Sequence, residues 1–160
     1  MSDPIYALTL ATALGCGLAA GVFFAFSSFV MAALARLPAP QGIAAMQSIN
    51  VMAPTPLFMT QLIGTAVACL GLEVWALASW GDSPAPWVAA GGALYVIGTI
   101  GVTMTRNVPL NNMLEALDPN SAEAVDSWKH YLARWTAWNH VRTIAALAAS
   151  GLLTVGLAVS

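Results

Sequence analysis

The stretch IYALTLATALGCGLAAGVFFAFSSFVMAALA, residues 5–35, contains no charged side chain. A helix needs about 20 apolar residues to cross the roughly 30 Å hydrocarbon core of a bilayer, and this stretch is longer. It also exceeds the roughly 7–15 apolar residues of a signal peptide, which follow a basic segment, whereas here the preceding residues hold Asp3 and no Lys or Arg. The stretch therefore predicts a membrane-spanning helix.

Three further apolar stretches are long enough to cross a bilayer, at residues 51–80, 84–105 and about 138–160. Of the 160 residues, 59% are hydrophobic and 8% are charged, and the mean hydropathy is +0.76. A soluble domain has about 25% charged residues. The pattern predicts a single all-α domain over residues 1–160, an integral membrane antiparallel four-helix bundle in a lipid bilayer.

The basic residues predict how the bundle is oriented. With four spans, the loops 36–50 and 106–137 share one side of the membrane, and the two termini share the other side with the turn at residues 81–83. All five basic residues lie in or next to these two loops: Arg36, Arg106, Lys129, Arg134 and Arg142. The positive-inside rule places the loops in the cytoplasm and both termini outside, in a membrane of the bacterial inner-membrane type.

Small residues in the first span predict close helix packing. Gly17 and Gly21 have the small-xxx-small spacing that lets helices approach, which permits a homo-oligomer without requiring one. Cys16 and Cys69 fall in different spans and are interpreted as buried thiols. The net charge of −2 and the lack of a basic patch give no indication of nucleic-acid binding.

Polar residues gather where the third span ends, in the sequence TRNVPLNN, residues 105–112. Proline lacks an amide hydrogen and disfavours helical geometry in the preceding residue, so the helix is predicted to end near Arg106. Helix capping by Asn and snorkelling of Arg106 explain one or two of these polar groups. They do not explain the clustering of Arg106 with Asn107, Asn111 and Asn112.

An aromatic face comes next along the chain. The spacings of three and four place its members on one side of a helix; they are Trp128, Tyr131, Trp135, Trp138 and Arg142, with Asn139 beside them. An interfacial belt is one interpretation, but a belt would face lipid at both membrane surfaces, and three of the six tryptophans lie on this one stretch. A small-molecule pocket is the favoured interpretation.

His140 lies about 150° from the mean of that face, at about 100° per residue. It shares the other side of the helix with Lys129, Thr136 and Thr143. Ionisable groups at membrane depth are costly, which makes His140 and Arg142 functional candidates. A structural role for His140 stays open.

The chain lacks the sequence motifs of several metal-binding, phosphate-binding and catalytic sites. The chain has no HExxH, no CxxC, no glycine-rich phosphate loop and no nucleophile elbow. With only His130 and His140 as imidazoles, no zinc or copper site made of protein ligands is predicted. Haem b with His140 or His130 as its axial ligand stays open.

Four motifs resemble the DUF1772, or anthrone oxygenase-like, membrane family. They are GVFFAFS at residues 21–27, MQSIN at 46–50, RNVPLN at 106–111, and the run from Trp128 to Thr143 that holds WNHVRT at 138–143. The resemblance covers essentially the whole chain. It implies a small four-helix membrane protein that oxidises polyketide anthrones to anthraquinones with dioxygen, without an added organic cofactor.

The resemblance suggests a division of roles. His140 would be the base that forms the enolate of a planar substrate, and Arg142 or Arg106 would stabilise the enolate oxygen. The groups expected to donate hydrogen bonds or to stack on the substrate are Asn50, Asn107, Asn111, Asn139, Trp128, Tyr131, Trp135 and Trp138. One geometric conflict remains, because His140 points away from the aromatic face.

Two other function classes stay open at this point. A haem-binding membrane protein would use the same flat aromatic pocket, with arginines at its rim for the propionates. A structural or partner-binding membrane subunit would use the polar and aromatic groups as a capping network, without catalysis.

Overall fold

The computed structural model describes residues 1–160, and every regular element in it is a helix. Its α-helices are α1 (Asp3–Ala25), α2 (Met31–Leu34), α3 (Ala39–Met52), α4 (Pro56–Ala78), α5 (Ala85–Leu94), α6 (Val108–Glu115) and α7 (Ala124–Ala158). Three π-helical segments lie between them, η1 (Phe26–Val30), η2 (Tyr95–Gly101) and η3 (Thr103–Asn107).

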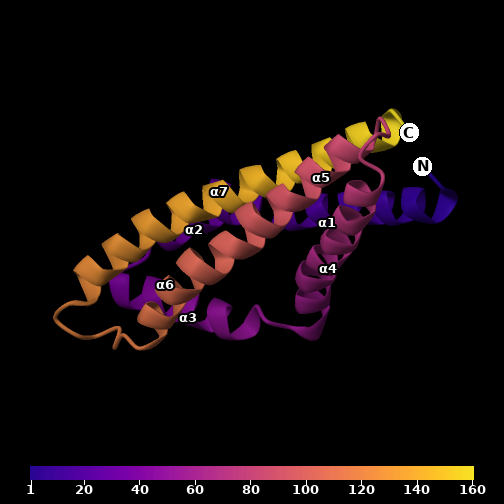
Figure 1. Cartoon of the computed structure of the whole chain (residues 1–160). Coiled ribbons are helices and arrows are strands. Elements are labelled where there is room, and N and C mark those ends of the chain that lie inside the picture. Colours follow the sequence, from indigo (N-terminus) through magenta and orange to yellow (C-terminus); the bar gives the residue numbers. More distant parts are fainter.

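Four continuous helices are long and apolar enough to cross a membrane, with mean hydropathies between 1.5 and 2.0. They are Asp3–Leu34, Pro56–Ala78, Ala85–Glu115 and Ala124–Ala158. Successive helices run in opposite directions, and both termini lie at one end of the molecule (Figure 1). The chain is therefore an integral membrane protein with an all-α, antiparallel four-helix bundle, as the sequence predicts. The cytoplasmic placement of the opposite end, called the loop end below, stays a prediction.

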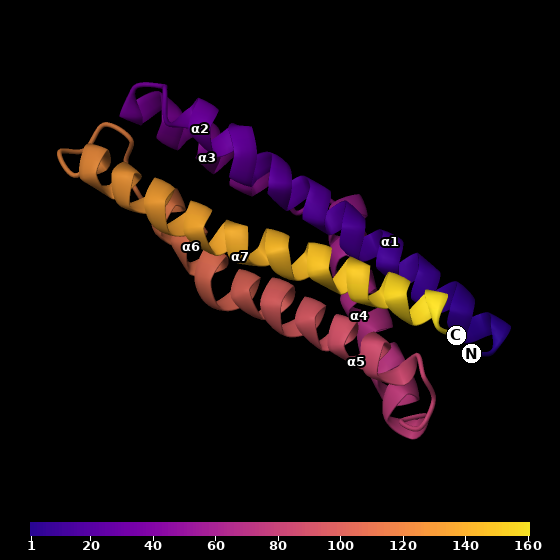
Figure 2. The same ribbon diagram turned by 90° about the horizontal axis from the view of Figure 1, so that it is seen from above.

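Helix α7 forms the centre of the bundle. It packs against α1 along one side and against α5 and η2 along another, while α4 packs on α1 and α5 (Figure 2). The short helix α3 lies at the loop end, where it contacts both α6 and α7 (Figure 1). Because α7 has protein on several sides, its polar side chains can be shielded from lipid.

Small residues allow these helices to approach closely. A Cβ atom on Gly91 of α5 would lie 3.1 Å from the Ala149 carbonyl oxygen of α7. The Ser150 hydroxyl group of α7 donates a hydrogen bond of 2.8 Å to the Ala13 carbonyl oxygen of α1. Such contacts are the usual means by which membrane helices associate, since apolar side chains gain little by leaving lipid.

The two glycines of the first span, Gly17 and Gly21, lie in different surroundings. A Cβ atom on Gly17 would lie 3.3 Å from the Ser150 hydroxyl oxygen, so Gly17 belongs to the packing of α1 on α7. Gly21 has open space around it. A homo-oligomer through this helix stays a prediction, and Gly21 is the member of the pair that a second chain could still contact.

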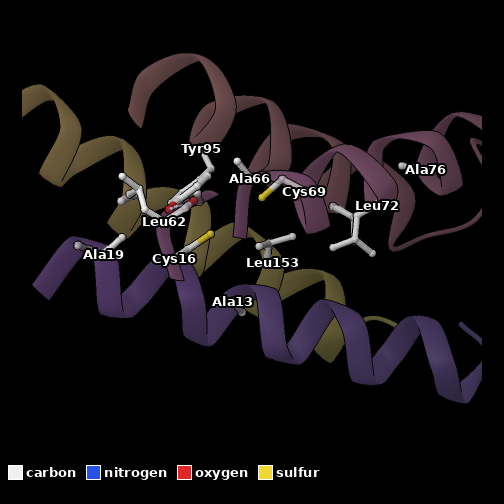
Figure 3. Close-up of a cluster of buried hydrophobic side chains, with 14 of the residues drawn as sticks. Ala13, Cys16, Ala19, Leu62, Ala66, Cys69, Leu72, Ala76, Tyr95 and Leu153 are labelled. Carbon is white, nitrogen blue, oxygen red and sulfur yellow. Dashed lines mark hydrogen bonds between the residues drawn. The ribbon is translucent and has the colours of Figure 1, made fainter. Parts of the chain in front are cut away.

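One apolar core lies between the four long helices, toward the termini. Figure 3 shows side chains from α1, α4, α7 and the third long helix pointing toward one another around Cys16, Cys69 and Tyr95. Both cysteines are free and buried. The Tyr95 hydroxyl group donates a hydrogen bond of 3.2 Å to the Leu62 carbonyl oxygen. A second core, at the loop end, contains the buried aromatic residues of α7.

The third long helix does not end near Arg106, and this prediction is wrong. The chain continues through η3 into α6 and stays helical to Glu115. Pro109 occupies the first turn of α6, where a missing amide hydrogen costs little. The wider π-helical turns before it make room for the proline ring, which would otherwise clash with a carbonyl group one turn back. As a result, Asn107 and Asn111 are carried on one continuous helix.

Candidate functional site

The predicted aromatic face of α7 points into the protein at the loop end. Trp128, Tyr131, Trp135, Asn139 and Arg142 are all buried, with exposed fractions of 5% or less. Their spacings of three and four residues place them on one side of the helix. This side therefore does not form a lipid-facing belt.

Three of these aromatic rings form a continuous stack. The ring centres of Trp128 and Tyr131 are 5.7 Å apart with an angle of 12° between the planes, and those of Tyr131 and Trp135 are 6.2 Å apart at 26°. Phe26 of η1 lies against the end of the stack, with its ring centre 5.7 Å from that of Trp135 and its plane tilted by 54°. The result is a row of flat apolar surfaces inside the bundle.

Two asparagines of the third long helix hold this stack in place. The Asn111 side-chain oxygen accepts hydrogen bonds from the Tyr131 hydroxyl group at 2.9 Å and from Trp135 Nε1 at 2.7 Å. Asn107, one turn earlier, donates from Nδ2 to the Trp135 carbonyl oxygen at 3.2 Å. Asn50 of α3 lies beside the Tyr131 hydroxyl group.

Asn139 joins α7 to the first helix. Its Nδ2 atom donates to the Phe23 carbonyl oxygen and to the Ser27 hydroxyl oxygen, both at 2.7 Å. Its Oδ1 atom accepts a hydrogen bond of 2.7 Å from Arg142 Nη2. The carboxamide thus uses its donor and acceptor sides together and is fully buried.

Arg142 is a buried cation without a carboxylate partner. Besides the bond to Asn139, its Nη1 atom donates to the Thr103 hydroxyl oxygen at 3.2 Å. Its guanidinium carbon lies 4.3 Å from the ring centre of Phe23 and 5.2 Å from that of Trp135. The one ion pair of the chain joins Lys129 and Asp126 at the surface. Neutral dipoles and aromatic faces alone therefore balance this charge.

Four buried polar atoms of this region have no hydrogen-bond partner: Asn50 Nδ2, Asn107 Oδ1, Trp128 Nε1 and Arg142 Nε. Leaving a buried polar group unsatisfied costs about 1–3 kcal/mol. Three of these atoms are donors and one is an acceptor. We call the whole set the polar-aromatic cluster; its members are Asn50, Asn107, Asn111, Trp128, Tyr131, Trp135, Asn139 and Arg142.

His140 lies outside this cluster. It is exposed and lines a groove of about 550 Å³ between α7 and the η1–α2 part of the first helix. The groove, called the histidine groove below, is lined by Ser27, Met31, Ala32, Ala35, Lys129, Leu132, Ala133, Thr136, Ala137 and His140. The expected base and the expected cation Arg142 are therefore on different sides of α7, as the helical angle predicts.

The remaining predicted site residues line a second groove of about 340 Å³, on the side of α7 that faces η3 and α6. This arginine groove is lined by Thr105, Arg106, Pro109, Leu110, His130, Arg134 and Trp138. The guanidinium carbon of Arg106 lies 4.9 Å from the Trp138 ring centre. Arg106 and Trp138 therefore pack against each other and lie outside the polar-aromatic cluster.

Sequence reasoning missed three contributors. Ser27 accepts from Asn139 and lies 3.2 Å from the Thr143 hydroxyl oxygen, Thr103 accepts from Arg142, and Phe23 covers the guanidinium group. Phe23 and Ser27 stand in the GVFFAFS motif, where only the family resemblance draws attention to them. Thr103 carries no such signal, because it is an ordinary residue of an apolar helix.

One known protein family matches more than half of the chain. The family model described as Anthrone oxygenase matches residues 50–152, which include all eight members of the polar-aromatic cluster. The chain belongs to the anthrone oxygenase family. Comparisons with curated proteins and with solved structures gave no match.

The family match gives no support to haem binding. His130 and His140 are both exposed and lie in different grooves of this anthrone oxygenase family member. No three His, Cys, Asp or Glu side chains come together in an arrangement that could hold a metal ion.

Proposed function

We propose that this protein oxidises a flat phenolic or anthrone-type molecule with dioxygen in the polar-aromatic cluster. The observation that carries the proposal is the state of Arg142, a buried cation that has two aromatic neighbours, no carboxylate partner and an unsatisfied Nε atom. Ionisable groups placed at membrane depth usually serve function. A cation in such a place suits a ligand that becomes negatively charged.

The charge requirement comes from the chemistry of anthrones. Loss of a proton from the ring carbon opposite the carbonyl group gives an enolate, whose negative charge lies largely on the oxygen. A fixed cation in a water-poor site stabilises such an oxyanion more strongly than water does. In the proposed complex, Arg142 Nε donates to this oxygen while Nη1 and Nη2 keep their bonds to Thr103 and Asn139.

Another unsatisfied atom matches a second group of such a ligand. Asn107 Oδ1 lies on the same helix as Thr103, one turn away, and can accept from a phenolic hydroxyl group. Phe23 and Trp135 both face the Arg142 guanidinium group, so a planar substrate beside it would contact these rings. Neither feature requires an organic cofactor.

The reaction balances without another oxidant. The enolate passes one electron to dioxygen, and the two radicals join as a new C–O bond at the deprotonated carbon. Protonation gives a hydroperoxide; loss of the second hydrogen of that carbon as a proton then breaks the O–O bond and leaves a carbonyl group and water. Overall, anthrone and dioxygen give anthraquinone and water. The polar-aromatic cluster contains no imidazole or carboxylate, so water accepts the first proton while Arg142 lowers the energy of the enolate.

The test is dioxygen uptake by purified protein in mild detergent with 1,8-dihydroxyanthrone, corrected for oxidation without protein. We expect one quinone formed for each dioxygen consumed. Arg142→Gln should lower kcat/KM by about 10²–10³-fold, as loss of an oxyanion-stabilising donor does elsewhere. Arg36→Gln, at an exposed arginine in the first loop, is the matched control and should keep the wild-type rate.

Two results would contradict the proposal. One is a wild-type rate no higher than the protein-free rate. The other is an Arg142→Gln protein that keeps its helical content and oxidises the substrate as fast as wild type. Measuring thermal unfolding of each variant alongside separates loss of catalysis from loss of the fold.

A further inference from the structure

The arginine groove contains positive charge that the proposed oxidation does not use. Arg106 and Arg134 line it from the two helices that form its walls, and His130 adds a third nitrogen-bearing side chain. No Asp or Glu lines the groove, and the one ion pair of the chain lies elsewhere. Two of the five Lys and Arg residues of the chain thus meet in one concave place without a negative partner.

The groove is partly organised before any ligand binds. Arg106 is held against the flat face of Trp138, at 4.9 Å from guanidinium carbon to ring centre. Such stacking limits the freedom of the side chain while leaving its N–H groups free to donate. Guanidinium groups recognise phosphate oxygens through pairs of parallel hydrogen bonds, which makes a phosphate the best-matched anion.

The apolar surface next to the groove indicates what kind of molecule carries that phosphate. Val141 lies seven residues after Arg134 and three after Trp138, so it continues the same face of α7 toward the middle of the membrane. Val141 is 40% exposed. A ligand with an anionic head and apolar chains would therefore place the head in the groove and a chain along Val141.

We infer that the arginine groove binds the phosphate-bearing headgroup of an anionic phospholipid. Basic pockets between membrane helices commonly serve such headgroups. The volume of about 340 Å³ suits a phosphate and its neighbouring atoms. The site is separate from the polar-aromatic cluster and does not depend on the proposed oxidation.

The experiment is native mass spectrometry of the full chain released from detergent with added phosphatidylglycerol or phosphatidylcholine. Wild type should retain one phosphatidylglycerol in preference to phosphatidylcholine. The double variant Arg106→Gln/Arg134→Gln should bind phosphatidylglycerol roughly twenty-fivefold more weakly, from roughly fivefold for each arginine. Arg36→Gln removes the same charge at a loop position outside the groove and should bind as wild type does.

Three outcomes would overturn the inference. Equal loss in Arg36→Gln would show that net charge and not the groove retains the lipid. No loss in the double variant would show that the two arginines do not retain it. Release of the lipid by millimolar inorganic phosphate would show a small-anion site instead of a lipid site. If the double variant does not fold, Arg134→Gln alone repeats the comparison, since this exposed side chain forms no ion pair.

Discussion

Asn139 and Arg142 form a single buried unit, in which Arg142 Nη2 donates a 2.7 Å hydrogen bond to the Asn139 side-chain oxygen. The same carboxamide donates to Phe23 and Ser27 of the first helix. One asparagine therefore both orients the guanidinium group and ties α7 to α1 and η1. A change at Asn139 should therefore affect both the stability of the bundle and the position of the Arg142 charge.

Replacing Asn139 with Ala should lower the free energy of unfolding by about 2–4 kcal/mol, because several buried groups, one of them charged, lose their partners together. Unfolding followed by circular dichroism in detergent measures the change. Asn112→Ala is the matched control, since Asn112 is exposed on α6. It should change stability by less than about 0.5 kcal/mol. Equal effects of both substitutions would refute the central role of Asn139.

A product-like ligand should stabilise the wild-type protein. With 1,8-dihydroxyanthraquinone at a hundred times its Kd, mass action adds about 2.7 kcal/mol to the free energy of unfolding. We expect Arg142→Gln to lose most of this gain, because the ligand oxygens lose their cationic partner. Anthracene has the same flat shape without oxygen and serves as the control. Equal stabilisation by anthracene would show that shape alone is recognised.

His140→Ala distinguishes two positions for the substrate. If the reaction takes place in the polar-aromatic cluster, kcat/KM should change by less than about threefold, since His140 touches neither the substrate nor Arg142. A loss of about 10²-fold or more, as expected for removal of a general base, would place the reaction in the histidine groove instead. Steady-state dioxygen uptake decides between them.

Gly42 lets α3 pack closely against Trp128 of α7. A Cβ atom there would lie 2.9–3.0 Å from three atoms of the Trp128 indole ring, which is itself packed against Tyr131. Gly42→Ala should therefore destabilise the protein by about 1–3 kcal/mol. Gly64→Ala, in a helix with open space around it, should be neutral or stabilise by up to about 1 kcal/mol. Thermal unfolding of both variants should show this difference, and a stabilised Gly42→Ala would contradict the packing.

The spans could be predicted from sequence because the bilayer sets a minimum apolar length. The aromatic face was predictable for a similar reason, because residues spaced by three and four lie on the same side of any α-helix. The direction of His140 came from the same periodicity. The rule that a proline ends a helix failed at Pro109. The π-helical turns before it keep the helix continuous, and no local sequence motif predicts those turns.

The different burial of Arg106 and Arg142 could not be predicted from the sequence. Both are arginines near aromatic residues at a span boundary, yet Arg142 is buried and Arg106 lies at a groove. That difference depends on which helix covers each side chain. The partners of Asn139 in the first helix are 112 and 116 residues away along the chain, so only the tertiary structure brings them together.

The π-helical stretch of the third long helix also sets the rotational register of the later residues in that helix. A π-helical turn contains an extra residue compared with an α-helical turn, so winding Tyr95–Gly101 as an α-helix with the same number of residues would rotate the rest of the helix by about 100°. Asn107 and Asn111 would then turn away from Trp135, while α4 and the start of α5 would stay in place. A change of helix type here would therefore act on the site as a whole, in a way that no single substitution of a cluster residue can reproduce.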